Sequence, residues 1–176
     1  MKTTFILLLA TVLALGCQSP KDKHRAPEEE SPSVDAAFVE PLSMDDSHVT
    51  ETVAFQGKEY KLSIDRLSDE SLPRVKGLDG DEFVDNRITL RVTAGAAHTL
   101  LNREFTRAAF ADELQGEPVT AYRLEALTFD KATAAGLVFI VSLGYPQSDL
   151  FVPIRLVVDY SGRLSMSPGS LIDEEE

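Results

Sequence analysis

The side chains with the strongest intrinsic chemistry in this chain are one cysteine and three histidines, which are far apart in the sequence. Cys17 ends an apolar segment, His24 and His48 precede the first clear strand pattern, and His98 lies beside a Gly-Ala turn. Nucleophilic catalysis needs a nucleophile held beside a base, and zinc sites need clustered His or Cys ligands. The sequence has neither spacing, and it has no Gly-x-Ser-x-Gly elbow or phosphate-binding glycine loop. We therefore predict no catalytic residue, no metal and no cofactor.

Two polar turns are the remaining candidate sites. Residues 79–82, an Asp-Gly-Asp-Glu turn, could offer carboxylate oxygens to Ca²⁺, but the next residue is Phe and the full calcium-loop pattern is missing. We expect the Asp-Asn pair at 85–86 to hydrogen-bond backbone groups at the start of a strand. The loop at 145–149 places an aromatic ring, a proline and polar groups together. The residues kept as candidate partner or ligand contacts are Asp85, Asn86, Tyr145, Pro146 and Asp149.

Cys17 is more informative about location than about catalysis. Residues 1–17 contain one lysine, then about a dozen apolar or small residues from Phe5 to Gly16, which is the order of a secretory signal. As a helix this apolar run would span only ~18 Å, too short for a hydrocarbon core of ~30 Å. Leu13 to Cys17 resembles a bacterial lipobox, which implies that Cys17 carries acyl chains such as palmitate. We expect a cell-envelope lipoprotein on the outer membrane, with the periplasmic or surface face left open.

Residues 18–47 have the composition of a spacer. They contain four prolines, eight acids and three bases, and too few large apolar side chains to offset the entropy of ordering. We predict a disordered tether at 18–47, one folded domain at 48–170 and an acidic tail at 171–176. The domain contains 17 acids and 13 bases, so most of the net charge of −12 belongs to the ends. It therefore lacks the basic footprint of a nucleic-acid binder.

Alternating apolar and polar residues dominate the predicted domain, as in strands with one buried face. The clearest case is 87–93, where Ile88, Leu90 and Val92 alternate with Arg and Thr. Residues 137–141 are apolar on both faces, which predicts a central strand. We predict eight strands in all, at 49–55, 60–65, 87–93, 98–105, 122–129, 136–143, 154–160 and 163–167.

The short connections between these strands predict an antiparallel meander. One helix interrupts it at 107–114, with Thr106 as the expected N-cap. The predicted fold class is all-β with one short helix and about eight strands. Such a meander can close into a lipocalin-like barrel or fold as a two-layer sandwich. The short loops slightly favour the barrel.

Four segments of the domain are distinctive in sequence. They are Phe-Val-Asp-Asn-Arg-Ile-Thr-Leu at 83–90, Arg-Glu-Phe-Thr-Arg at 103–107 followed by Phe110, Leu-Thr-Phe-Asp-Lys at 127–131, and Gly-Tyr-Pro-Gln-Ser-Asp at 144–149. Together they resemble a family of uncharacterised lipoproteins from Bacteroidetes, domain of unknown function 4738. The resemblance covers most of residues 50–168. It implies a small, mostly β envelope domain behind a lipid anchor, and it implies no catalytic residue.

Three functions remain open at this point. The favoured one is a lipid-anchored interaction module that contacts an envelope protein, because the sequence contains no catalytic set. The second is a carrier of a small apolar ligand inside a barrel, lined by Tyr60, Leu90, Phe139 and Leu156. The third and least favoured is a hydrolase, which would require two carboxylates converging in one cleft.

Overall fold

The structure, a computed structural model, describes residues 40–96 and 98–170. In chain order the elements are β1 (Ser47–Phe55), β2 (Lys58–Ser68), β3 (Val75–Lys76), β4 (Glu82–Phe83), β5 (Asn86–Ala94), β6 (His98–Phe105), the 3₁₀ helices η1 (Arg107–Leu114) and η2 (Val119–Ala121), β7 (Arg123–Thr133), β8 (Gly136–Gly144), β9 (Phe151–Val158) and β10 (Leu164–Pro168). All eight predicted strands are present at overlapping positions. Cys17, the spacer up to residue 39 and the tail at 171–176 lie outside the described residues.

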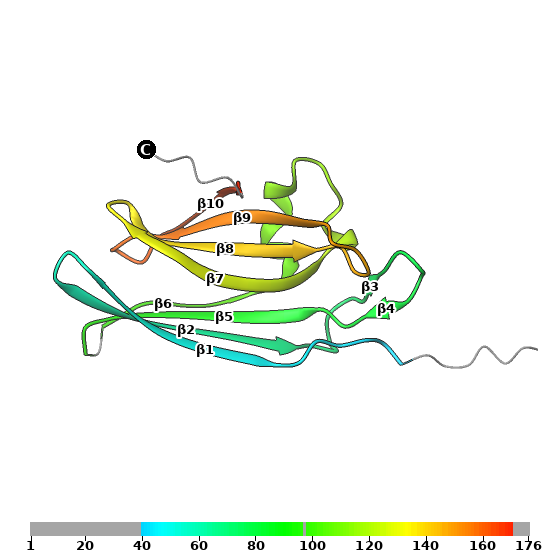
Figure 1. Cartoon of the computed structure of the whole chain (residues 1–176), viewed down its shortest axis with the longest axis horizontal. Helices are drawn as coiled ribbons and strands as arrows, with labels where there is room; N and C mark the ends of the chain where they lie inside the picture. The colour runs from blue at the N-terminus through cyan, green and yellow to red at the C-terminus, as the bar shows by residue number, and fades with distance from the viewer. Residues whose placement is uncertain (1–39, 97, 171–176) are drawn as a thin grey trace, which may run out of the picture. The chain divides into compact units, whose positions relative to one another are not determined.

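Two four-stranded antiparallel sheets form the domain, in the orders β1-β2-β5-β6 and β10-β9-β8-β7. Figure 1 shows them as two layers, one above the other, with the small β3–β4 hairpin at one end. The two-layer sandwich is therefore confirmed, and the closed barrel that the short loops favoured is wrong. The reason lies in residues 106–122, where η1 and η2 carry the chain from β6 in one sheet to β7 in the other. Within the described residues no ladder pairs β6 with β7.

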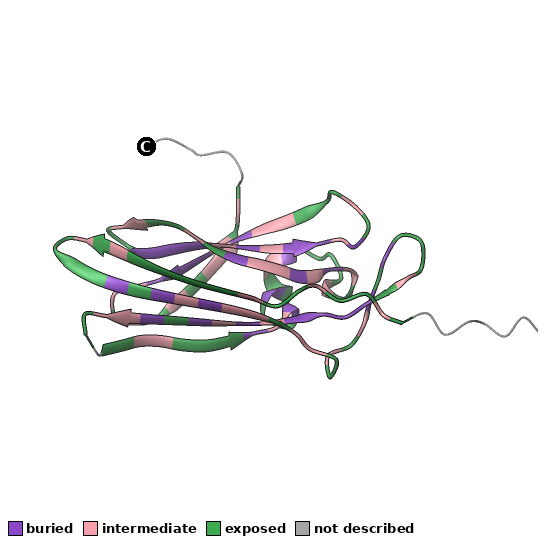
Figure 2. Cartoon of the chain, turned by 60° about the horizontal axis from the view of Figure 1, so that its bottom comes forward, coloured by how far each residue is buried: buried purple, intermediate pink, exposed green. Residues whose placement is uncertain are grey.

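The core lies between the two sheets and is filled by side chains. Buried and more exposed positions alternate along the strands, as Figure 2 shows, because successive residues point to opposite faces. Each sheet contributes inward residues that are almost fully buried, including Leu62, Ile64, Ile88, Leu90 and Val92 from the first and Leu124, Leu137, Phe139, Val141, Ile154 and Leu156 from the second. The four residues expected to line a ligand cavity belong to this core and are at most 3% exposed. A carrier function in that interior is therefore not supported.

Strand β8 is buried on both faces, as its sequence predicted. Leu137 and Phe139 belong to the core between the sheets, whereas Val138 points to the other face. All three side chains are 0% exposed. Val138 is paired across the ladder with Val157, which is 7% exposed. The β-branched run therefore has apolar neighbours on the outer face as well.

The predicted helix is present with its predicted bounds, as the 3₁₀ helix η1. Phe110 and Leu114 are buried in the core, and the Phe105 and Phe110 rings stack with centroids 5.7 Å apart. Thr106 occupies the N-cap position, but its side chain makes no capping hydrogen bond, so that expectation is wrong. Burial against the sheets therefore holds this short helix, as expected for a segment too short to be stable alone. Of the helices in the described residues, none has the length and apolarity needed to cross a membrane.

Ordered contacts of the domain begin before the predicted boundary at residue 48. The backbone of Leu42 accepts a hydrogen bond from Val84 N and donates one to Glu82 O, both at 2.9 Å. Ser68 Oγ donates to Met44 O at 2.7 Å. These residues are fixed mainly by backbone groups, which every sequence carries, so hydropathy does not reveal them.

Candidate functional site

The outer face of the sheet β1-β2-β5-β6 is mostly polar. Its outward side chains form three rows across the strands because the β1–β2 and β2–β5 ladders have no register shift. In strand order the rows are His48–Asp65–Thr89–Glu104, Thr50–Ser63–Arg91–Asn102 and Thr52–Lys61–Thr93–Thr99. Outward polar residues from separate segments of the sequence therefore lie side by side on one face of the sheet.

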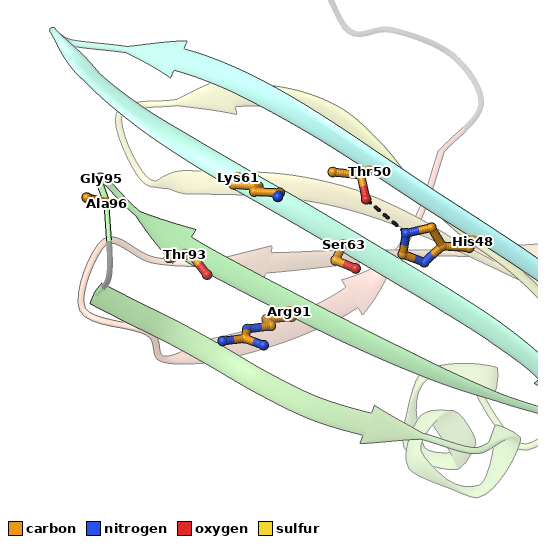
Figure 3. A pocket seen from close by; sticks show the side chains of 8 residues that line it. All are labelled: His48, Thr50, Lys61, Ser63, Arg91, Thr93, Gly95 and Ala96. Atoms are coloured by element: carbon orange, nitrogen blue, oxygen red, sulfur yellow. Dashed lines mark hydrogen bonds between the residues drawn. The ribbon is translucent and has the colours of Figure 1, made fainter.

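A hollow of about 390 Å³ lies on this face. Its lining comes from His48 and Thr50 of β1, Lys61 and Ser63 of β2, Arg91 and Thr93 of β5, and the turn at 95–96. Figure 3 shows these side chains projecting from three neighbouring strands. The hollow contains cations, hydroxyl groups and an imidazole, and it has no large apolar side chain in its lining.

A chain of polar contacts runs along the rim of the hollow. His48 Nδ1 contacts the Asp65 carboxylate, and His48 Nε2 lies 3.1 Å from Thr50 Oγ1 (Figure 3). An ionised carboxylate only accepts hydrogen bonds, so the contact with Asp65 places a proton on Nδ1, and in the neutral imidazole Nε2 then accepts from the Thr50 hydroxyl. Carboxylate, imidazole and hydroxyl in this order can relay a proton. The His48 side chain is 63% exposed, however, so water reaches the imidazole freely.

Two cations in the hollow have no ion-pair partner among the described residues. Lys61 and Arg91 are exposed, and within residues 40–96 and 98–170 neither side chain has a hydrogen-bond or ion-pair partner. They occupy diagonal positions on β2 and β5, a spacing of roughly 7–8 Å in such ladders. Arg87 on the same face, by contrast, is paired with two carboxylates, Asp69 at 2.6 Å and Glu104 at 2.5 Å. The lining of the hollow therefore contains two unpaired cations and no carboxylate.

The ion pair of Asp69 with Arg87 makes stability depend on acid pH. Hydrogen bonds from Ser71 and Arg87 lower the Asp69 pKa from 3.8 to about 2. Because the pKa is lower in the folded state, the stabilisation is present above about pH 4 and is lost as the pH falls through about 2. We expect Asp69→Asn to lower the urea midpoint at pH 7, and the gap from the wild type to close towards pH 2. A difference in urea midpoint between variant and wild type that stays constant with pH would contradict this. The control is Asp112→Asn, at an exposed residue without a polar partner in the described chain.

Two of the predicted contact residues, Asp85 and Asn86, lie inside the domain. They are 1% and 0% exposed. Asp85 Oδ1 accepts from Leu124 N at 3.0 Å, and Asn86 Nδ2 donates to Leu124 O at 2.8 Å. Both side chains thus bond to backbone, as expected, but mainly to strand β7 rather than to their own turn. A partner cannot reach them in this conformation.

Arg107 completes this buried polar cluster. Its Nε lies 3.4 Å from Asp85 Oδ2, and its Nη1 and Nη2 donate to Tyr122 O at 3.1 Å and Pro73 O at 2.9 Å. Burial raises the pKa of Asp85, while hydrogen bonds from the Leu124 and Asn86 backbone and the charge of Arg107 oppose that rise. The cluster ties η1, β7 and the segment before β5 together, which is a structural role.

The loop at 145–149 packs against the acidic turn at 79–82. Gln147 Nε2 donates to Asp81 Oδ2 at 2.8 Å, and Asp79 N donates to Gln147 Oε1 at 3.0 Å. Pro146 is buried, Tyr145 is half-buried and Asp149 is exposed. The structure therefore brings together the two polar turns noted in the sequence. No three His, Cys, Asp or Glu side chains gather as metal ligands in the part of the chain that the structure describes.

A comparison with known families shows to which family the chain belongs. The model of the family described as "Domain of unknown function (DUF4738)" matches residues 27–166. The chain belongs to the DUF4738 family. The match includes both sheets of the sandwich, the hollow and the buried cluster at Asp85. A search of curated proteins finds no match to the chain.

The hollow of this DUF4738 domain is not apparent from the sequence. Its residues come from three strands and a turn, and those on the strands are common polar residues on an outward face. The available signal was the alternation at 61–65 and 87–93, which correctly places Lys61, Ser63 and Arg91 outward. The pairing of β1 with β2 and β2 with β5, which joins them, is a long-range property of the fold.

Proposed function

We propose that this DUF4738 protein is a lipid-anchored binding module of the cell envelope. The binding role is supported by the hollow on the outer face of β1-β2-β5-β6, which offers unpaired cations and hydroxyl groups to solvent. The sandwich interior is packed, so a ligand or partner would bind at the surface. The partner is an envelope component, and the module is held on the outer membrane by acyl chains, such as palmitate, on Cys17.

The anchor is supported by sequence order. A lysine, an apolar run from Phe5 to Gly16 and then Cys17 follow one another as in a lipoprotein signal. Each buried CH₂ contributes ~0.8 kcal/mol, so several acyl chains on one cysteine give stable attachment. The spacer that follows would let the domain reach partners away from the membrane surface.

Replacing Cys17 by alanine should move the protein from the membrane fraction to the soluble fraction. The acylated side chain is then missing, so neither attachment nor incorporation of labelled palmitate is possible. Fractionation and metabolic labelling of the full chain measure both effects. Ser31→Ala, a change in the predicted spacer, is the control and should leave both unchanged. A Cys17→Ala protein that stays in the membrane fraction would contradict the anchor.

An apolar ligand remains a second candidate at a different place from the one first predicted. A cavity of about 200 Å³ opens between β1, β2 and β7, and its apolar lining includes Val49, Leu62, Ile64, Leu127 and Phe129. Of these, Val49 is exposed and Phe129 is half-buried, so the cavity is open to solvent. It is half the volume of the polar hollow, which is why binding at the hollow is preferred.

A further inference from the structure

The polar hollow on β1-β2-β5-β6 has the charge pattern of a site for an anion. Lys61 and Arg91 have no polar partner among the described residues, although the chain as a whole has 29 acids and 17 bases. Asp65, the acid at the rim, already accepts from His48 and from Ser63 Oγ, the latter at 3.5 Å. Glu59, two residues before Lys61, does not line the hollow. The two cations are therefore available to a ligand.

Hydroxyl groups surround these cations on fixed strand positions. Thr50 lies across β1–β2 from Ser63, and Ser63 lies across β2–β5 from Arg91. Thr93 lies across from Lys61 in the next row. Figure 3 shows these side chains on the same side of the sheet. The β1–β2 and β2–β5 ladders that carry these residues have no register shift, and the shift at Val92/Thr93 lies on the β5–β6 side, so the backbones that carry the donors are fixed before a ligand binds.

We propose that this hollow binds a small ligand that carries both an oxyanion and hydroxyl groups, of which a phosphorylated sugar or polyol is the simplest form. Arg91 and Lys61 hold the oxyanion by charge-assisted hydrogen bonds. Thr50, Ser63 and Thr93 exchange hydrogen bonds with the ligand's hydroxyl groups. A volume of about 390 Å³ suits a ligand of this size. The inference rests on the proposed binding function and names its ligand class.

Calorimetric titration of the full-length protein tests the ligand class directly. Glucose 6-phosphate should bind, inorganic phosphate should bind more weakly, and neutral glucose should not bind measurably. Because the site is exposed, affinity should fall as salt is raised. In NMR spectra, glucose 6-phosphate should shift the imidazole resonances of His48, which lines the hollow, more than those of His98, which does not.

Single substitutions localise the binding. We expect Lys61→Ala and Arg91→Ala each to weaken glucose 6-phosphate binding about tenfold, as for the loss of one charged hydrogen bond. Both side chains are exposed, so the fold should survive. The matched control is Lys58→Ala with Arg155→Ala, which removes one lysine and one arginine from strands β2 and β9 outside the hollow. The control should leave the affinity within twofold.

Vesicles distinguish a free ligand from a lipid headgroup of the same chemistry. Phosphatidylinositol carries a phosphorylated polyol, whereas phosphatidylcholine vesicles serve as the comparison. Binding to glucose 6-phosphate alone identifies a soluble ligand, and binding to phosphatidylinositol vesicles that requires Lys61 and Arg91 identifies a headgroup. Either result supports the proposal. It is overturned if neither probe binds, or if the control pair weakens binding as much as the hollow variants.

Failure of this inference is separable from failure of the proposed function. If no phosphorylated probe binds but Cys17→Ala still releases the protein, the anchored module stands and its ligand class is wrong. If glucose 6-phosphate binds but Cys17→Ala stays on the membrane, the site stands and the anchor is wrong.

Discussion

Replacing Arg107 by alanine is expected to lower the free energy of unfolding by about 3–5 kcal/mol, because it leaves a buried charge without its partner. The Arg107 side chain is 6% exposed, and the Asp85 side chain that it faces is 1% exposed. The substitution also leaves the carbonyl groups of Tyr122 and Pro73 without their donors. Urea unfolding at pH 7 measures the effect. Arg91→Ala, at an exposed and unpaired arginine, is the control and should change stability by less than about 0.5 kcal/mol.

A second substitution tests whether the orphaned carboxylate causes this loss. Asp85→Asn removes the negative charge, so Arg107→Ala combined with Asp85→Asn should lose less stability than the sum of the single changes. Acid should act in the same direction. The pKa of Asp85 is raised, so the folded protein takes up this proton before the unfolded chain, and the Arg107→Ala deficit should shrink as the pH falls towards 4. Additive losses that do not vary with pH would show that lost packing is the cause.

The partners within the buried polar cluster could not be predicted from the sequence. Asp85 and Asn86 were predicted to bond to backbone groups, and they do, but their main partner is Leu124, 38 or more residues away. Arg107 was assigned only to the short helix. An exposed polar turn and a buried polar cluster have the same local sequence, and only the long-range fold distinguishes them.

Strand positions were predictable because alternation reports burial directly. Ile88, Leu90 and Val92 are all 0% exposed, as the pattern at 87–93 predicted. Strands β3 and β4 were missed because two-residue strands have no measurable period. The local sequence pattern also does not distinguish a barrel from a sandwich. The choice depends on whether residues 106–122 continue one sheet or cross to another, and the buried side chains of Phe110 and Leu114 attach this crossing segment to the core.

The hollow also could not be predicted from the sequence, although the outward position of its residues could. Alternation placed Lys61 and Arg91 in water, which the structure confirms. An outward cation on a strand is normally only a solubilising group, and most such residues need no further explanation. The hollow follows from the β1-β2-β5 order, which sets His48, Lys61 and Arg91 around one depression. Strand order depends on contacts between residues far apart in sequence, so the site emerges only with the fold.

Replacing Phe139 by alanine should lower the free energy of unfolding by about 3–5 kcal/mol, because it opens a cavity in a filled core. Phe139 is 0% exposed on the central strand β8, and its ring packs edge-on to Phe129 with centroids 5.6 Å apart. Phe151→Ala, at a phenylalanine that is 43% exposed on β9, is the matched control and should have a much smaller effect. Urea unfolding measures both.

The same variant tests whether the interior is a natural ligand site. A dry apolar cavity left by a core truncation can bind a small apolar molecule such as benzene, and binding to the folded state alone raises stability. Benzene should therefore raise the urea midpoint of Phe139→Ala and leave that of the wild type unchanged, because the wild-type Phe139 lies in a filled core that also contains Tyr60, Leu90 and Leu156. Benzene could also bind the wild type in the separate cavity beside β7, and Leu127→Gln makes the lining of that cavity polar. If benzene stabilises the wild type as much as Phe139→Ala, and also stabilises Leu127→Gln, the interior between the sheets holds a ligand-sized void. That result would favour the carrier over the surface-binding module.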